Sequence, residues 1–117
     1  MGDLSKNFNR AEFACQCGCG EDTIDYATVE LCEAVREHFC QPVTITSGIR
    51  CMWHNERVGG SANSLHVLGR AADIVVRGVD PEDVADFLED KAPGLGRYTT
   101  FTHLDTRSGG NARWSGA

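Results

Sequence analysis

The sequence predicts an α+β domain, because two segments have the periodicity of amphipathic helices and three others have the composition of β-strands. The chain has 117 residues, close to the usual size of one domain, so residues 1–117 are expected to form a single domain. Hydrophobic residues make up 41% of the chain and charged residues 24%. Both values are typical of a folded globular protein and not of a disordered chain.

The first helix is expected from Tyr26 to Phe39. Small or apolar residues at positions 28, 31, 32, 35 and 39 line one face of a helix with 3.6 residues per turn. Asp25 is the expected N-cap, and Pro42 marks the end of the segment. Residues 43–46 are rich in β-branched side chains and predict a short strand.

A second, largely buried strand is expected over residues 71–76, which are almost entirely apolar. The next helix is expected to begin after Asp80, since proline at the first helical position and acidic residues in the first turn favour a helix start. Pro93 and Gly94 are expected to end that segment. A third strand is predicted from Tyr98 to Thr106.

The charge and hydropathy patterns exclude several classes of partner. A net charge of −6 argues against nucleic-acid binding. The chain has no stretch of eighteen apolar residues, so no membrane span is predicted. The first residues do not resemble a secretory signal, so we expect synthesis in the cytoplasm. We also expect a monomer that binds neither nucleic acid nor a membrane.

Two histidines and one aspartate stand out as metal-ligand candidates. Asp73 interrupts an apolar strand and needs a cation, hydrogen-bond donors or a place at the strand end. His66 lies in the loop before that strand, and His103 lies on the third strand. Three such ligands are what a catalytic zinc ion takes from a protein. Taken alone, these residues are also compatible with an aspartate satisfied by backbone amides.

The same residues carry a resemblance to the zinc D-Ala-D-Ala peptidases, a group that also includes lysostaphin-type enzymes and the hedgehog signalling domain. The main motif resembles S-x-H-x-x-G-x-A-x-D and reads Ser64-x-His66-x-x-Gly69-x-Ala71-x-Asp73. Further similar segments are Ser47-Gly48-Ile49-Arg50, His103-Leu104-Asp105-Thr106-Arg107 and Ala112-Arg113-Trp114. The resemblance covers nearly the whole chain and implies a zinc domain with a small antiparallel sheet flanked by helices.

The resemblance also implies roles for individual residues. His66, Asp73 and His103 would ligate one catalytic zinc ion. Arg50 would hold the carboxylate of a substrate peptide or its acyl-side carbonyl, a role that suits a planar guanidinium. Ser64 would support the site through a hydrogen bond to His66 or to substrate.

One position departs from the pattern of several relatives. They place an acidic residue, the general base, three positions before the last histidine, where this chain has Thr100. The nearest carboxylate on the same strand face is that of Asp105. Asp105 is therefore expected either to activate water as the catalytic base or to orient a metal ligand, and spacing leaves both roles open.

Six cysteines remain, and a reducing compartment would disfavour disulfide bonds among them. Cys15, Cys17 and Cys19 could hold a second, structural zinc ion with Cys40 or Cys51 as the fourth ligand. The sequence does not favour this second site, because no C-x-x-C pair occurs.

The function implied by the resemblance is that of a zinc peptidase acting on peptidoglycan stem or cross-link peptides, of the D-Ala-D-Ala carboxypeptidase or endopeptidase type. It would serve cell-wall lysis or remodelling after release or delivery to the wall, as in small phage or prophage enzymes. The alternative is a catalytically inactive, zinc-stabilised binding module on the same scaffold. Thr100 favours this alternative, whereas Arg50 beside a complete ligand set favours the enzyme.

Overall fold

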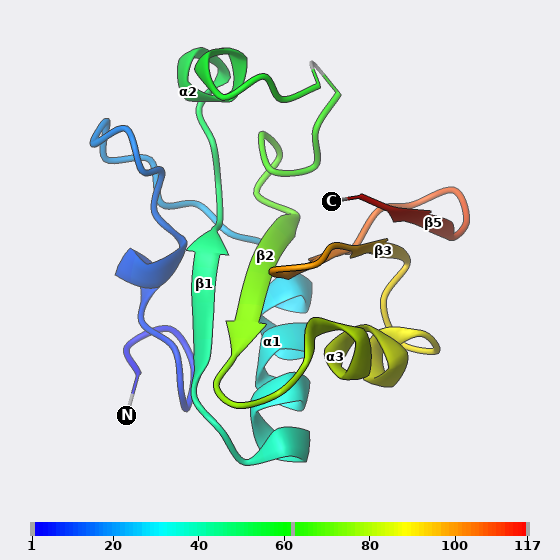
Figure 1. Ribbon diagram of the computed structural model, residues 1–117. Helices are drawn as coiled ribbons and strands as arrows, with labels where there is room; N and C mark the ends of the chain where they lie inside the picture. The colour runs from blue at the N-terminus through cyan, green and yellow to red at the C-terminus, as the bar shows by residue number, and fades with distance from the viewer. Residues whose placement is uncertain (1, 62, 117) are drawn as a thin grey trace.

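The computed structural model describes residues 2–61 and 63–116 (Figure 1). The elements follow one another in the order η1 (Arg10–Phe13, a 3-10 helix), α1 (Tyr26–Phe39), β1 (Val43–Ser47), α2 (Met52–Arg57), β2 (Ala71–Val76), α3 (Pro81–Leu88), β3 (Gly94–Arg97), β4 (Thr102–Asp105) and β5 (Ala112–Ser115). The expected α+β class is confirmed.

The five strands form one sheet in the order β1-β2-β4-β3-β5. The first three pairs in this order are antiparallel, but β3 and β5 run parallel. The expected small antiparallel sheet accounts for β1, β2, β4 and β3, and β5 adds one parallel pair that makes the whole sheet mixed. The parallel pair arises because residues 106–111 carry the chain from the end of β4 across the start of β3, so that β5 adds to the free edge of β3 in the same direction.

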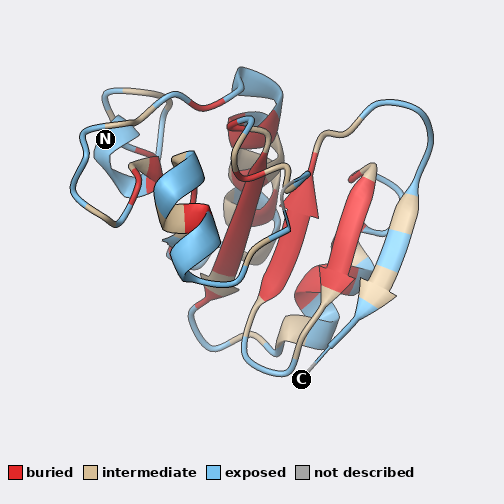
Figure 2. Ribbon diagram, turned by 90° about the horizontal axis from the view of Figure 1, so that it is seen from above, coloured by how far each residue is buried: buried red, intermediate tan, exposed pale blue. Residues whose placement is uncertain are grey.

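Helices α1 and α3 lie on the same face of the sheet and contact each other as well as the central strands (Figure 1). Successive side chains of the strands therefore point alternately toward the helices and toward the opposite face. Ala72 and Ile74 of β2 and Leu104 of β4 point into the core under the helices, and all three are buried. The residues between them, including Asp73 and His103, face the opposite side. Figure 2 shows that β2 and β4 are buried along their length, whereas β5 forms a more exposed edge.

The helix starts follow the expected capping chemistry. Asp25 accepts a hydrogen bond from the backbone of Ala27, and Asp80 accepts one from the backbone of Glu82. Helix α1 ends where Cys40 adopts a left-handed conformation with φ 53°.

Four elements differ from the sequence-based expectation. The short helix α2 and the edge strand β5 were not predicted, and β3 begins at Gly94, where a break was expected. The strand expected from Tyr98 to Thr106 is confined to Thr102–Asp105. Among the described residues, no helix combines the length and the apolar character needed to cross a bilayer.

We expect Leu104→Ala to lower the free energy of unfolding by about 2–5 kcal/mol, because Leu104 is fully buried between the sheet and the helices and its truncation leaves a cavity. Leu68→Ala is the matched control, since Leu68 is 62% exposed and its truncation should cost less than about 0.5 kcal/mol. Urea denaturation at constant zinc concentration measures both. Equal costs for the two variants would contradict the assigned core.

Candidate metal centre and active-site cleft

The three candidate ligands meet on the sheet face opposite the helices. Asp73 of β2 is the register partner of His103 of β4, so that their side chains lie next to each other on this face. His66 comes from the loop that leads into β2. One ligand atom from each of the three residues lies within 4.8 Å of the others, and all three residues are buried. The predicted ligand set therefore converges in space.

The ring of His66 is held in one orientation. Its Nδ1 atom lies 2.8 Å from the carbonyl oxygen of Gly48. When Nδ1 donates its proton to this carbonyl, Nε2 presents its lone pair toward Asp73, whose Oδ1 lies 3.3 Å away. Ser64 supports the same loop, because its hydroxyl oxygen accepts a hydrogen bond of 3.2 Å from the backbone N–H of His66.

His103 is held from its far side. Its Nδ1 atom lies 2.9 Å from Oδ1 of Asp73, while its Nε2 atom lies 2.8 Å from Oδ2 of Asp105. Arg107 in turn donates to both oxygens of Asp105, at 2.9 Å from Nε and 2.7 Å from Nη2. Both carboxylate oxygens of Asp105 are therefore engaged, and its side chain is fully buried behind His103.

The electrostatics of the centre favour charged carboxylates. Burial alone would raise the pKa of Asp73, but hydrogen bonding with the His103 and His66 imidazoles outweighs it and lowers this pKa to about 2. Burial likewise opposes ionisation of Asp105, but its hydrogen bonds with Arg107 and His103 hold its pKa well below the usual range. Asp73 is thus ready to serve as an anionic metal ligand.

The donor set fits zinc. Two imidazoles and one carboxylate are ligands that zinc accepts, and three protein ligands leave one position open. All three candidate ligands and Arg50 line a cleft of about 480 Å³. The hydrogen bonds from His66 to the Gly48 carbonyl and from His103 to Asp105 are the outer contacts that commonly fix metal-binding histidines.

Strand β3 contributes bare backbone to this face. Gly94 is the register partner of Asp105, and a Cβ atom at Gly94 would lie 1.9 Å from Oδ1 of Asp105. A Cβ atom at Gly96 would lie 2.6 Å from Nε1 of Trp114. Glycine at these two positions lets Asp105 and Trp114 lie across the strand, and Leu95 between them faces the core.

Aromatic side chains form one wall of the cleft. The rings of Tyr98 and Phe101 stack with centroids 4.4 Å apart, and Trp114 donates a 2.8 Å hydrogen bond to the hydroxyl of Tyr98. Trp114 also packs on His103, with ring centroids 5.0 Å apart. No role was predicted for these aromatic residues from the sequence, and for Trp114 the only signal was its place in the Ala112-Arg113-Trp114 ending.

Other predicted residues are placed as follows. Arg50 lies at the cleft with Nη2 3.8 Å from Oδ2 of Asp73. Thr100 is exposed and does not contribute to the cleft lining. A second group of potential ligands consists of Cys15, Cys17, Cys19 and Cys51, without Cys40.

A family model described as Peptidase M15 matches residues 6–105, which is most of the chain. The chain belongs to the peptidase M15 family. The matched range contains the three candidate ligands and Arg50, and membership supports peptidase activity in a family that is typically zinc-dependent. No curated protein matches this M15 chain significantly.

We expect His66→Ala and His103→Ala each to remove one zinc equivalent per chain, because the two remaining ligands are fewer than the three that a catalytic zinc ion takes. His38→Ala is the control, since His38 lies at the end of α1, where its ring stacks on Phe87. Metal analysis of the purified variants provides the measurement. Full zinc content in both ligand variants would disprove this ligand set.

We expect Asp105→Asn to weaken zinc affinity about 10–100-fold, because it removes the negative partner of His103 Nε2. Competition with a chromophoric chelator measures this affinity. Asp90→Asn is the matched control, because the Asp90 side chain is 81% exposed. Unchanged affinity together with a ~10²–10⁴-fold loss of hydrolysis would instead identify Asp105 as the general base.

Proposed function

We propose that the protein is a zinc-dependent peptidase that hydrolyses peptidoglycan stem or cross-link peptides. One observation carries the proposal. His66, Asp73 and His103 converge at a cleft that also presents Arg50, a group able to hold a peptide carboxylate. Membership of the M15 family supports the hydrolytic class, and the proposed substrate rests on the resemblance to D-Ala-D-Ala peptidases.

Zinc held by these three residues would act as a Lewis acid that polarises a carbonyl and makes water a competent nucleophile near neutral pH. Asp105 would keep Nε2 of His103 protonated, so that Nδ1 remains available toward Asp73 and the metal. Of the two roles left open for Asp105, its full engagement by His103 and Arg107 favours the orienting one.

Arg50 is suited to position the substrate. Its Nη1 donates to Oδ1 of Asn55 at 3.2 Å, and its Nε donates to the hydroxyl of Ser47 at 3.3 Å. Asn55 and Ser47 fix the guanidinium, whose Nη2 also lies 3.8 Å from Oδ2 of Asp73, and the Arg50 side chain is 17% exposed at the cleft. A fixed planar cation of this kind favours a carboxylate, such as the free end of a stem peptide, or a carbonyl.

The cleft also suits a short peptide. Its volume of about 480 Å³ lies within the usual range for small-ligand sites. The wall formed by Tyr98, Phe101 and Trp114 offers apolar surface for the small aliphatic side chains of such a peptide. Within the cell wall, the activity would serve lysis or remodelling after the protein is released or delivered, as in phage or prophage enzymes.

A zinc-stabilised binding module without hydrolysis is the second candidate. Asp73 is the only acidic side chain lining the cleft among the described residues, and Thr100 is exposed where several relatives have an acid. A chain of this kind would still bind peptides through Arg50 and the aromatic wall.

Digestion of purified peptidoglycan, followed by mass spectrometry of the released peptides, tests the proposal. We expect defined peptide products that disappear on addition of a chelator and return with zinc. A folded His103→Ala variant is the matched control. Peptide binding without any product would exclude the peptidase and establish the binding module.

We expect Arg50→Ala to lower kcat/KM roughly tenfold to over a hundredfold on short peptides, because it removes a charge-assisted contact of about 1.5–3 kcal/mol. Arg57→Ala is the control, because Arg57 is exposed on α2 and packs on Trp53. Thermal melting should show that Arg50→Ala changes the stability of the fold less than it changes kcat/KM. Unchanged kcat/KM would remove Arg50 from the substrate site.

A further inference from the structure

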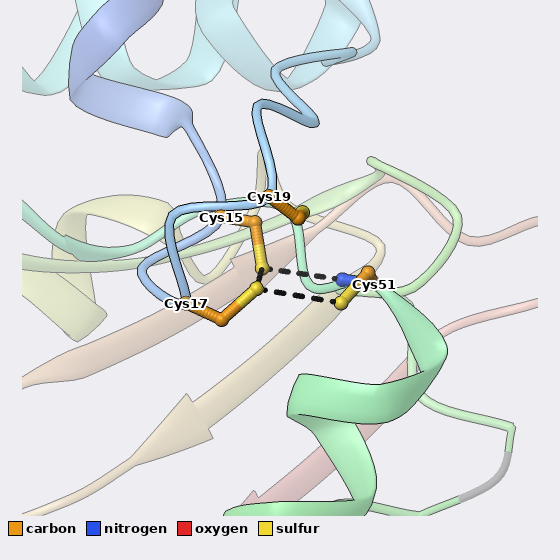
Figure 3. Close-up of side chains that lie close together, drawn as sticks. All are labelled: Cys15, Cys17, Cys19 and Cys51. Atoms are coloured by element: carbon orange, nitrogen blue, oxygen red, sulfur yellow. Dashed lines mark hydrogen bonds between the residues drawn. The ribbon is translucent and has the colours of Figure 1, made fainter.

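Four cysteines gather where the loop after η1 meets the start of α2 (Figure 3). The sulfur atoms of Cys15 and Cys17 are 3.5 Å apart, and those of Cys17 and Cys51 are 3.6 Å apart. With Cys19, all four sulfurs lie within 4.8 Å of one another. This cluster shares no residue with the candidate ligand set of His66, Asp73 and His103.

Two separate segments bring the sulfurs together. Cys15, Cys17 and Cys19 lie in one loop after η1, and Cys51 directly precedes α2. The loop closes on itself through a 2.8 Å hydrogen bond from the backbone N–H of Cys15 to the carbonyl of Glu21. Gly18 and Gly20 have φ values of 85° and 91°, which allow tight turns that fold the alternating cysteines toward one point.

The sulfurs also receive hydrogen bonds from backbone N–H groups. The N–H of Cys51 donates to the sulfur of Cys15 at 3.4 Å, and the N–H of His54 donates to the sulfur of Cys51 at 3.4 Å. The N–H of Glu21 donates to the sulfur of Cys19 at 3.5 Å. Such donors stabilise a thiolate more than a thiol, because hydrogen bonds to an ionised acceptor are the stronger ones.

If several of these sulfurs ionise, their negative charges require a cation close by. Adjacent thiolates repel each other, and a bound divalent metal removes that penalty by displacing the protons.

We propose that Cys15, Cys17, Cys19 and Cys51 bind a second metal ion, a structural zinc held by four thiolates. Four sulfur ligands on a tetrahedral ion leave no open position, which is typical of structural and not of catalytic zinc. The soft thiolate set selects zinc or iron over magnesium and calcium. The sulfurs are well beyond the roughly 2.05 Å of a disulfide bond, and all six cysteines are free.

The second ion would fix the segment that carries the active-site contacts. Cys51 follows Arg50, whose backbone N–H donates to the carbonyl of His66 at 3.0 Å. Gly48, three residues before Cys51, supplies the carbonyl that orients His66, and the neighbouring Ile49 N–H donates to the carbonyl of Phe13 at 2.9 Å. The cysteine site thus ties the N-terminal loop to the segment that positions both His66 and Arg50.

Metal analysis of the chain purified with zinc tests this site. We expect two zinc ions per chain, falling to one in Cys17→Ser and Cys51→Ser but remaining two in Cys40→Ser, because Cys40 is exposed and outside the cluster. His66→Ala should also hold one ion, and the Cys51→Ser/His66→Ala double variant should hold none. If the cysteines bind no zinc, His66→Ala should still lose the ion of the His66, Asp73 and His103 site. The two sites are therefore tested separately.

Cobalt substitution gives a second measurement that needs no activity and no folded cysteine variant. Cobalt bound by thiolates shows intense sulfur-to-metal charge-transfer absorption in the near ultraviolet, which imidazole and carboxylate ligands do not produce. We expect this absorption in the unsubstituted chain, in Cys40→Ser and in His66→Ala, and not in Cys51→Ser. Its absence from the unsubstituted chain would overturn the proposal. So would a disulfide within the cluster in freshly purified, zinc-supplemented protein, detected as a mass loss of two hydrogens.

Discussion

The antiparallel register between β2 and β4 is the constraint on which the rest of the structure depends. It sets Asp73 opposite His103 and Ala71 opposite Asp105, all on the face that the helices leave uncovered. A slip of one residue would turn Asp73 and His103 into the core and bring Ile74 and Leu104 out of it. The same alternation therefore builds the hydrophobic core and the candidate metal centre, and neither can change register without the other.

Sequence alone predicted α1 and α3 from their helical periodicity and β2 from its apolar run, and it predicted the candidate ligands from their chemical types and motif. It did not predict β3, because Gly-Leu-Gly-Arg has low β-propensity and reads as a turn. The structure gives the physical reason. Both glycines face the crowded side, where Asp105 and Trp114 occupy the space of their missing side chains. The only side chain needed for the core, that of Leu95, lies between them.

The sequence also could not predict the contacts between segments that are distant along the chain. Spacing put Asp105 on the same face as His103, but it could not tell whether the carboxylate pointed toward the cleft or behind the imidazole. The answer depends on Arg107, which engages both oxygens from the far side. Similarly, Cys40 and Cys51 were equal candidates by position along the chain. The fold separates them, because α1 ends at Cys40 whereas the segment after β1 returns Cys51 to the N-terminal loop.

The packing of Trp114 on His103 gives this protein a built-in optical reporter. Indole emission responds to nearby charge and to the protonation of a neighbouring imidazole, and these rings are 5.0 Å apart. The chain has a single other tryptophan, Trp53, which is 59% exposed on α2 beside Arg57. Replacing Trp53 by phenylalanine would leave Trp114, at the cleft, as the one tryptophan of the chain. Loading of the centre and arrival of a peptide could then be followed in real time without a label.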